Sequence, residues 1–114
     1  MLTRFRIQLS DCPIVSILRG ITPDEVIPVC EELAAAGITL MEITLNSPNA
    51  IESIRLAVNH FENSEVLIGA GTVLTEEEVN AVATVGGKYI ISPNINTKVI
   101  KETKKLDLIS IPGF

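Results

Sequence analysis

The sequence lacks clustered positive charge, long apolar stretches and a secretory signal. Its net charge is −5, and no basic run is longer than the pair Lys104-Lys105. A nucleic-acid surface needs grouped Lys and Arg, and a membrane span needs roughly 18 consecutive apolar residues, which no stretch approaches. Residues 1–10 contain Arg4 and Arg6 in place of the apolar core of a signal peptide. These absences predict a cytoplasmic protein with no nucleic-acid partner and no membrane partner.

Cysteine and histidine are also scarce. Cys12 and Cys30 have neither metal-ligand nor redox-motif spacing, so we interpret them as two ordinary thiols of an intracellular protein. The single histidine, His60, lies near the end of a predicted helix, away from any acidic or cysteine cluster, and we expect it at the surface. No set of residues in the sequence therefore predicts a metal site.

What the sequence does contain is a repeated alternation of apolar runs and helical patterns. The 114 residues are 46% hydrophobic and 20% charged, which suits a single domain over residues 1–114 with a real core. Four short apolar runs and the beginning of a fifth read as strands, and each gap between them holds one helical pattern. The runs are 14–18, 40–45, 66–68, 89–91 and a fifth from 108.

The predicted helices have clear start and stop signals. Thr22-Pro23-Asp24-Glu25 and Thr75-Glu76-Glu77-Glu78 are typical capping boxes, and Ser47-Pro48 is expected to open a helix in the same way. Asn96 or Thr97 caps the last helix. Gly37 and Gly86-Gly87 are expected to end the helices that precede them.

Strands that alternate with helices and read as continuous apolar runs indicate a parallel sheet. Two architectures fit this pattern. A doubly wound open sheet would be complete at five strands, whereas a (β/α)₈ barrel needs about 200 or more residues, of which this chain would be the first half. In both architectures the polar segments that follow the strands gather at the carboxyl end of the sheet, where functional sites are built.

Glu42 is the one charge inside the apolar run of residues 40–45, on the same strand face as Leu40 and Thr44. A buried carboxylate is costly unless it is paired, hydrogen-bonded or protonated. Two interpretations stay open: a structural pair with Arg19, or a general base held in a partly dry site.

Two further segments at strand ends carry possible chemistry. Arg19, before Gly20, is either a solvated cation or a fork for a substrate carboxylate or phosphate. The segment 69–72, Gly-Ala-Gly-Thr, lets a ligand approach the backbone, and Thr72 offers a hydroxyl and an amide. It is not a dinucleotide fingerprint, because Leu74 stands where the third glycine would be.

Four segments together resemble a known family. They are "ILRGITPDE", "EITLNSP", "IGAGTVLTEEEV" and "ISPNI", in this order and spacing. From about Ile14 to Gly113, the chain resembles the amino-terminal half of the 2-keto-3-deoxy-6-phosphogluconate and -galactonate aldolases, the KDPG/KHG aldolase family. The combination "LRGI", "LNSP" and "SPNI" is more similar to the phosphogalactonate branch than to the phosphogluconate branch.

The resemblance implies a (β/α)₈ TIM barrel and a class I aldolase. In that chemistry a lysine forms an iminium with the C2 ketone of a 3-deoxy-2-keto-6-phospho sugar acid, and the C3–C4 bond breaks once the C4 hydroxyl loses its proton. The products are pyruvate and glyceraldehyde 3-phosphate. The resemblance implies that Glu42 transfers the proton through a water and that Arg19 and Thr72 hold the pyruvyl carboxylate. It also implies no metal, no organic cofactor and a homo-oligomer, a trimer in the full-length family.

The sequence departs from the family at the nucleophile. The family's Schiff-base lysine lies on the sixth strand in a Lys-x-Phe-Pro segment, which is absent here, as are the phosphate-binding glycine turns of the seventh and eighth strands. We therefore expect strands one to five of the barrel, inactive alone. Two hypotheses remain: an aldolase whose other half lies outside this sequence, or an inactive half-barrel that binds keto acids weakly or self-associates.

Overall fold

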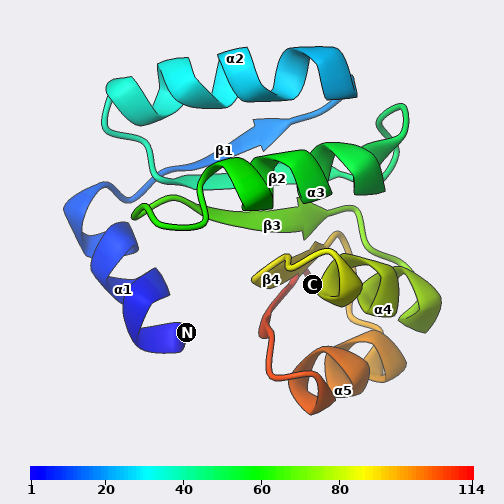
Figure 1. The fold of residues 1–114 in the computed structure, drawn as a ribbon. Helices are drawn as coiled ribbons and strands as arrows, with labels where there is room; N and C mark the ends of the chain where they lie inside the picture. The colour runs from blue at the N-terminus through cyan, green and yellow to red at the C-terminus, as the bar shows by residue number, and fades with distance from the viewer.

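The computed structural model describes residues 1–114 and contains one parallel sheet of five strands in the sequential order β1-β2-β3-β4-β5 (Figure 1). A doubly wound sheet reverses its strand order at a switch point, and this sheet does not. The strands are close to those predicted from the apolar runs, although β3 continues through the glycines. They are β1 (Val15–Leu18), β2 (Leu40–Thr44), β3 (Leu67–Gly71), β4 (Tyr89–Ser92) and β5 (Ile109–Pro112).

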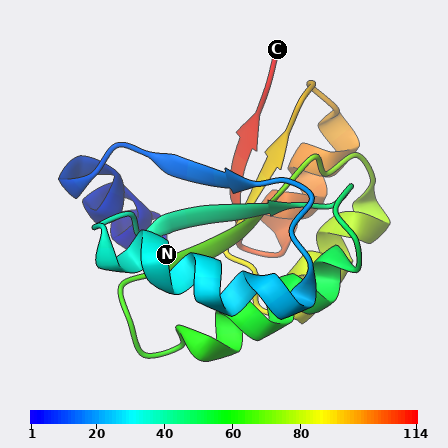
Figure 2. The same ribbon diagram turned by 90° about the horizontal axis from the view of Figure 1, so that it is seen from above.

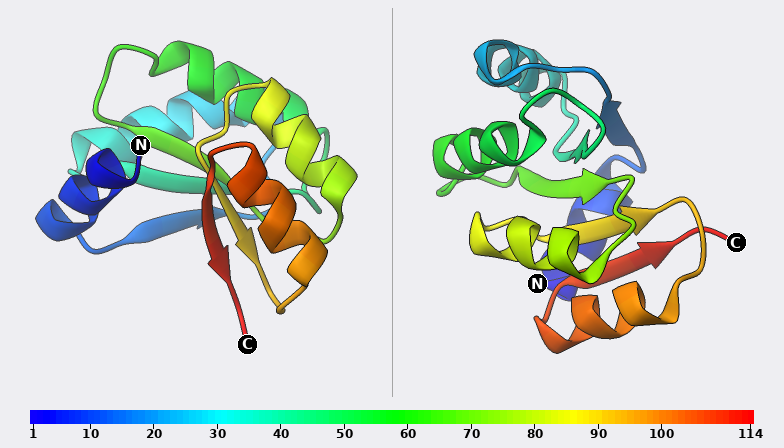
Figure 3. Two further views of the ribbon diagram at one scale, coloured as in Figure 1. Left: turned by 90° about the horizontal axis from the view of Figure 1, so that it is seen from below. Right: turned by 90° about the vertical axis from the view of Figure 1, so that its right-hand side faces the viewer.

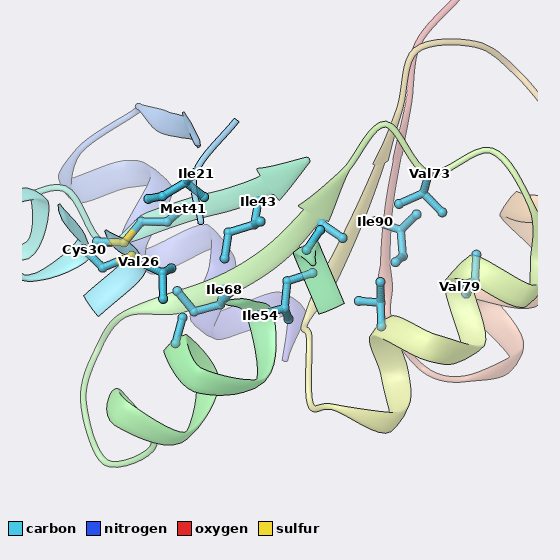
Figure 4. Packing of buried hydrophobic residues seen from close by; sticks show 14 of the residues in the cluster. Ile21, Val26, Cys30, Met41, Ile43, Ile54, Ile68, Val73, Val79 and Ile90 are labelled. Atoms are coloured by element: carbon cyan, nitrogen blue, oxygen red, sulfur yellow. The ribbon is translucent and has the colours of Figure 1, made fainter. Parts of the chain in front are cut away.

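Four of the five helices cover the same face of this sheet, as Figures 1 and 3 show. Their apolar sides form the main core with one face of the strands; Val26 and Cys30 of α2 and Ile54 of α3, for example, pack in the cluster that contains Ile43 and Ile90 (Figure 4). None of the helices is long and apolar enough to cross a membrane. The four are α2 (Pro23–Ala35), α3 (Ala50–His60), α4 (Glu76–Thr84) and α5 (Thr97–Lys105).

The fifth helix, α1 (Leu2–Asp11), was not predicted from the sequence. It lies at the amino-terminal ends of the strands (Figure 2) and buries Phe5 in a second, smaller cluster on the opposite face of the sheet. That cluster contains Leu40, Leu67, Tyr89 and Ile109. Only Phe5 and Gln8 of α1 are buried, although Leu2, Phe5 and Leu9 are spaced as on one face of a helix.

Sequential parallel strands with their connecting helices on one face are the arrangement of a (β/α)₈ barrel, of which this chain forms about half. The barrel prediction is therefore confirmed, and the doubly wound alternative is wrong. β1 and β5 each pair on one side only, so both edges of the curved sheet are unpaired within the chain.

Most of the predicted helix ends are confirmed, with one exception. The backbone N–H of Thr22 donates to Glu25 Oε1 at 3.0 Å, and that of Thr75 donates to Glu78 Oε1 at 3.1 Å. The prediction that Ser47-Pro48 opens a helix is wrong, because α3 begins at Ala50 after a left-handed N-cap residue, Asn49, with φ of 51°. The hydroxyl group of Ser47 instead makes hydrogen bonds at the carboxyl ends of β1 and β2.

Candidate active site

The carboxyl ends of β1, β2 and β3 bring the three predicted site residues to one edge of the sheet. Arg19 directly follows Leu18, the last β1 residue paired with β2. Thr72 directly follows Gly71, which pairs with Thr44 at the end of β2. Glu42 lies between them in the register, opposite Ile17 of β1 and Gly69 of β3.

Glu42 is 4% exposed, and its Oε2 atom is buried without a hydrogen-bond partner. Burial raises the pKa of this carboxyl group above its ordinary value, and the positive charge of Arg19 opposes that rise in part. The structural pair with Arg19 does not form, since the ion pairs of the chain are Arg55–Glu52 and His60–Glu31. A buried carboxyl group with an oxygen that accepts no hydrogen bond from the protein can exchange a proton with a substrate or a water.

Two glycines of β3 make this arrangement possible. A Cβ at Gly71 would lie 2.9 Å from Glu42 Cδ, and a Cβ at Gly69 would lie 2.6 Å from Tyr89 Cγ. The glycines of the 69–72 segment therefore accommodate side chains of the neighbouring strands β2 and β4. The prediction that they let a ligand approach the backbone stays a prediction.

Tyr89 also borders the predicted site, and the sequence analysis did not identify it. Its ring crosses β3 above Gly69, and its hydroxyl lies 2.6 Å from Met41 O and 3.1 Å from Leu67 O. Burial, with a contribution from the charge of Glu42, raises the pKa of Tyr89. The sequence signal was available: a glycine and an aromatic residue occupy matching positions of adjacent parallel strands.

Arg19 and Thr72 differ in how the chain holds them. Arg19 is exposed, and its Nη1 donates to Asn46 Oδ1 at 3.2 Å. Thr72 is half-buried with φ of 55°, a left-handed conformation that costs a β-branched residue about 1–2 kcal/mol. Strain of this kind is concentrated at functional sites, where the surrounding structure holds it in place.

The site opens onto the concave side of the sheet and is not part of an enclosed cavity. None of the four cavities of the structure is lined by Arg19, Glu42 or Thr72. No three His, Cys, Asp or Glu side chains gather in a way that could hold a metal ion. The lysines are not strand residues: Lys88 precedes β4, and the others lie on α5.

Comparison with known proteins matches residues 6–114 to the family model "KDPG and KHG aldolase". The probable 2-dehydro-3-deoxy-6-phosphogalactonate aldolase of Rhizobium meliloti (strain 1021) and the 2-dehydro-3-deoxy-6-phosphogalactonate aldolase of Escherichia coli (strain K12) are each 42% identical over 101 residues. Each alignment covers 89% of this chain. It covers 47% of the Rhizobium meliloti relative and 49% of the Escherichia coli relative. The chain thus spans about half the length of the curated relatives that it matches.

Solved structures agree with these matches. A native KDPGal structure superposes with a TM-score of 0.86 at 41% identity, covering 90% of this chain and 49% of that chain. The KDPG aldolase of Legionella pneumophila, captured with pyruvate as a covalent carbinolamine intermediate, superposes with a TM-score of 0.84 at 31% identity. That alignment covers 94% of this chain and 51% of that chain.

Proposed function

Because the chain belongs to the KDPG and KHG aldolase family, we propose that it supplies the keto-acid-binding and proton-transferring half of an aldolase active site. The observation that carries the proposal is Glu42, a buried carboxyl group with an unpartnered oxygen at the carboxyl edge of a half-barrel. A residue with that environment near a cation is a typical general base.

In the proposed reaction, Arg19 and Thr72 bind the carboxylate of the pyruvyl end of the substrate. Glu42, directly or through a water, accepts the proton of the C4 hydroxyl, and the C3–C4 bond then breaks. The electron pair of that bond moves into the iminium at C2, which becomes an enamine, and the aldehyde is released. A proton then adds to C3, and water hydrolyses the iminium to free pyruvate and the lysine. The iminium-forming lysine comes from outside residues 1–114, since the lysines of this chain lie on α5 or before β4.

The substrate that we propose is 2-dehydro-3-deoxy-6-phosphogalactonate, with glyceraldehyde 3-phosphate as the aldehyde product. Two phosphogalactonate aldolases are 42% identical to the chain, whereas the phosphogluconate aldolase of Haemophilus influenzae (strain ATCC 51907 / DSM 11121 / KW20 / Rd) is 32% identical. Asn46 is uncharged and accepts a hydrogen bond from Arg19, so Arg19 is the only cation next to Glu42 that can bind the carboxylate.

The test is a fusion in which residues 1–114 are followed by the remaining half of the Escherichia coli relative, called the completed barrel below. We expect it to release pyruvate from the phosphogalactonate substrate with a kcat/KM at least equal to that for the phosphogluconate epimer. A strong preference for the gluconate epimer would overturn the substrate assignment. A folded completed barrel that releases no pyruvate from either epimer would overturn the function.

The two unpaired edges favour a second candidate, an inactive half-barrel that self-associates through β1 or β5. Apolar parallel edge strands are prone to pair with another chain. Light scattering on the 114-residue chain separates the candidates: concentration-dependent oligomers with no keto-acid binding favour the second.

We also propose that the complete enzyme is a cytoplasmic homotrimer. Support for a symmetric oligomer comes from a cube-shaped protein cage designed by fusing symmetric oligomeric domains, of which a chain superposes with a TM-score of 0.84 at 41% identity. That alignment covers 88% of this chain and 37% of the cage chain. The molar mass of the completed barrel in solution tests this proposal, and a monomer would contradict it.

A further inference from the structure

The hydroxyl group of Ser47 has a place in the fold that its sequence position does not predict. Ser47 is 7% exposed although it lies in the turn that follows β2. Since α3 begins only at Ala50, the hydroxyl is not a helix cap. The backbone N–H of Ser47 donates to Thr44 O at 3.0 Å, and this turn directs the side chain back toward the ends of β1 and β2.

Ser47 Oγ connects these two strand ends. It accepts a hydrogen bond from the backbone N–H of Gly20 at 2.8 Å and lies 2.9 Å from Thr44 Oγ1. The pairing of β1 with β2 ends at Leu18, so Ser47 supplies the acceptor that the strand ladder no longer provides. Gly20 itself is exposed, so this hydrogen bond fixes the position of its backbone, with a net contribution of about 0.5–1.5 kcal/mol.

Arg19 lies in the chain between two of these contacts. Arg19 stands between Leu18, which β2 holds, and Gly20, which Ser47 holds. Its guanidinium group then reaches Asn46, the neighbour of Ser47 in the same turn, at 3.2 Å. The backbone is thus fixed on both sides of the arginine, while the side chain stays near Glu42 without an ion pair.

We propose that Ser47 is a positioning residue of the keto-acid site, which acts by holding Gly20 and thereby the guanidinium group of Arg19 beside Glu42. The inference rests on the proposed function, since it assigns Arg19 to the substrate carboxylate. Placement of this kind has large effects, because a shift of about 1 Å in a binding group can reduce rates by about 10²-fold.

The first experiment is an NMR titration of the 114-residue chain with pyruvate. We expect Ser47→Ala to weaken pyruvate binding about 3- to 10-fold, the effect of losing one hydrogen bond that places a charged group. Ser47→Thr keeps the hydroxyl and should bind within about twofold of the unmodified chain. Ser53→Ala is the matched control, because Ser53 is a buried serine whose hydroxyl has no hydrogen-bond partner.

A double-mutant cycle separates positioning from general stability. If Ser47 acts through Arg19, adding Ser47→Ala to Arg19→Ala should weaken binding by less than about twofold more. Hydrogen exchange gives a second readout: the Gly20 amide should exchange faster in Ser47→Ala. Ser47→Cys, a near-isosteric change with a weaker acceptor, should show an intermediate loss and covers the case in which Ser47→Ala does not fold.

The outcomes separate the positioning role of Ser47 from the proposed function. Pyruvate affinity in Ser47→Ala and Ser47→Cys equal to that of the unmodified chain, or full additivity with Arg19→Ala, would overturn the positioning role alone. An unmodified, folded chain that binds no pyruvate would instead overturn the proposed function on which that role rests.

Discussion

Gly71 leaves the space that the carboxyl group of Glu42 occupies. A Cβ at residue 71 would overlap Glu42 Oε2 and lie 2.9 Å from Glu42 Cδ and 3.2 Å from Thr44 Cγ2. The absence of a side chain on β3 therefore permits an acid on β2. This relationship places the proposed proton-transfer group in a fixed, water-poor position between two strands.

Gly71→Ala is expected to destabilise the chain by about 1–3 kcal/mol, the usual cost of overpacking a buried site. The cost should fall when Glu42→Ala is combined with it, because the overlapping carboxyl atoms are then gone. Urea unfolding of the two single variants and the double variant measures this coupling. If Gly71→Ala lowers the free energy of unfolding equally with and without Glu42→Ala, the Glu42 side chain does not need the space at Gly71.

The raised pKa of Glu42 predicts a pH dependence of stability. Burial makes the folded state bind the proton more tightly than the unfolded state, so stability is lost as the pH rises from the ordinary carboxyl pKa through the raised one. Glu42→Gln removes this titration and should raise the free energy of unfolding at pH 7 by about 0.5–2 kcal/mol. Unfolding curves from pH 4 to pH 8 test this, and an unchanged pH profile in Glu42→Gln would contradict it.

Arg19→Ala in the completed barrel is expected to raise KM for the keto acid about 10-fold or more. That corresponds to about 1.5–3 kcal/mol for a hydrogen bond to a charged group. The control is Arg55→Ala, which removes an exposed arginine paired with Glu52 on α3 and should leave KM unchanged. A KM unaffected by Arg19→Ala would show that the carboxylate is bound elsewhere.

The 114-residue chain alone should form no covalent adduct with pyruvate under borohydride reduction, because its lysines lie on α5 or before β4. The completed barrel, which contains the second half of the relative, should gain the mass of one reduced pyruvate. Intact-mass spectrometry of both proteins makes the comparison. A single modified lysine in the 114-residue chain would contradict the proposal that the iminium-forming lysine comes from outside residues 1–114.

The strands and most helix ends were predictable because their signals are local. Continuous apolar runs such as Leu40–Thr44 are buried on both faces, and capping residues such as Thr75 satisfy orphan N–H groups within one turn. The position of Glu42 was also predictable, since one charge in an apolar strand is evident from sequence.

The features that were missed depend on contacts between distant segments. Ser47 was expected to cap a helix, but its partner Gly20 is 27 residues away. The close approach of Gly71 to Glu42 and of Gly69 to Tyr89 was not predicted, because each contact joins two different strands. Helix α1 was missed although Leu2, Phe5 and Leu9 are spaced as on a helix, and its packing through Phe5 on the sheet is a contact with distant segments.

The central claim is that Glu42 transfers the proton in carbon–carbon bond cleavage, and the turnover of Glu42→Gln in the completed barrel tests it most directly. Gln keeps the shape of Glu but cannot accept the C4 hydroxyl proton, so kcat for pyruvate release should fall about 10²- to 10⁴-fold. KM should change little, because the carboxylate is bound by Arg19. An unchanged kcat in a folded Glu42→Gln protein would contradict the account and leave Glu42 with a structural role.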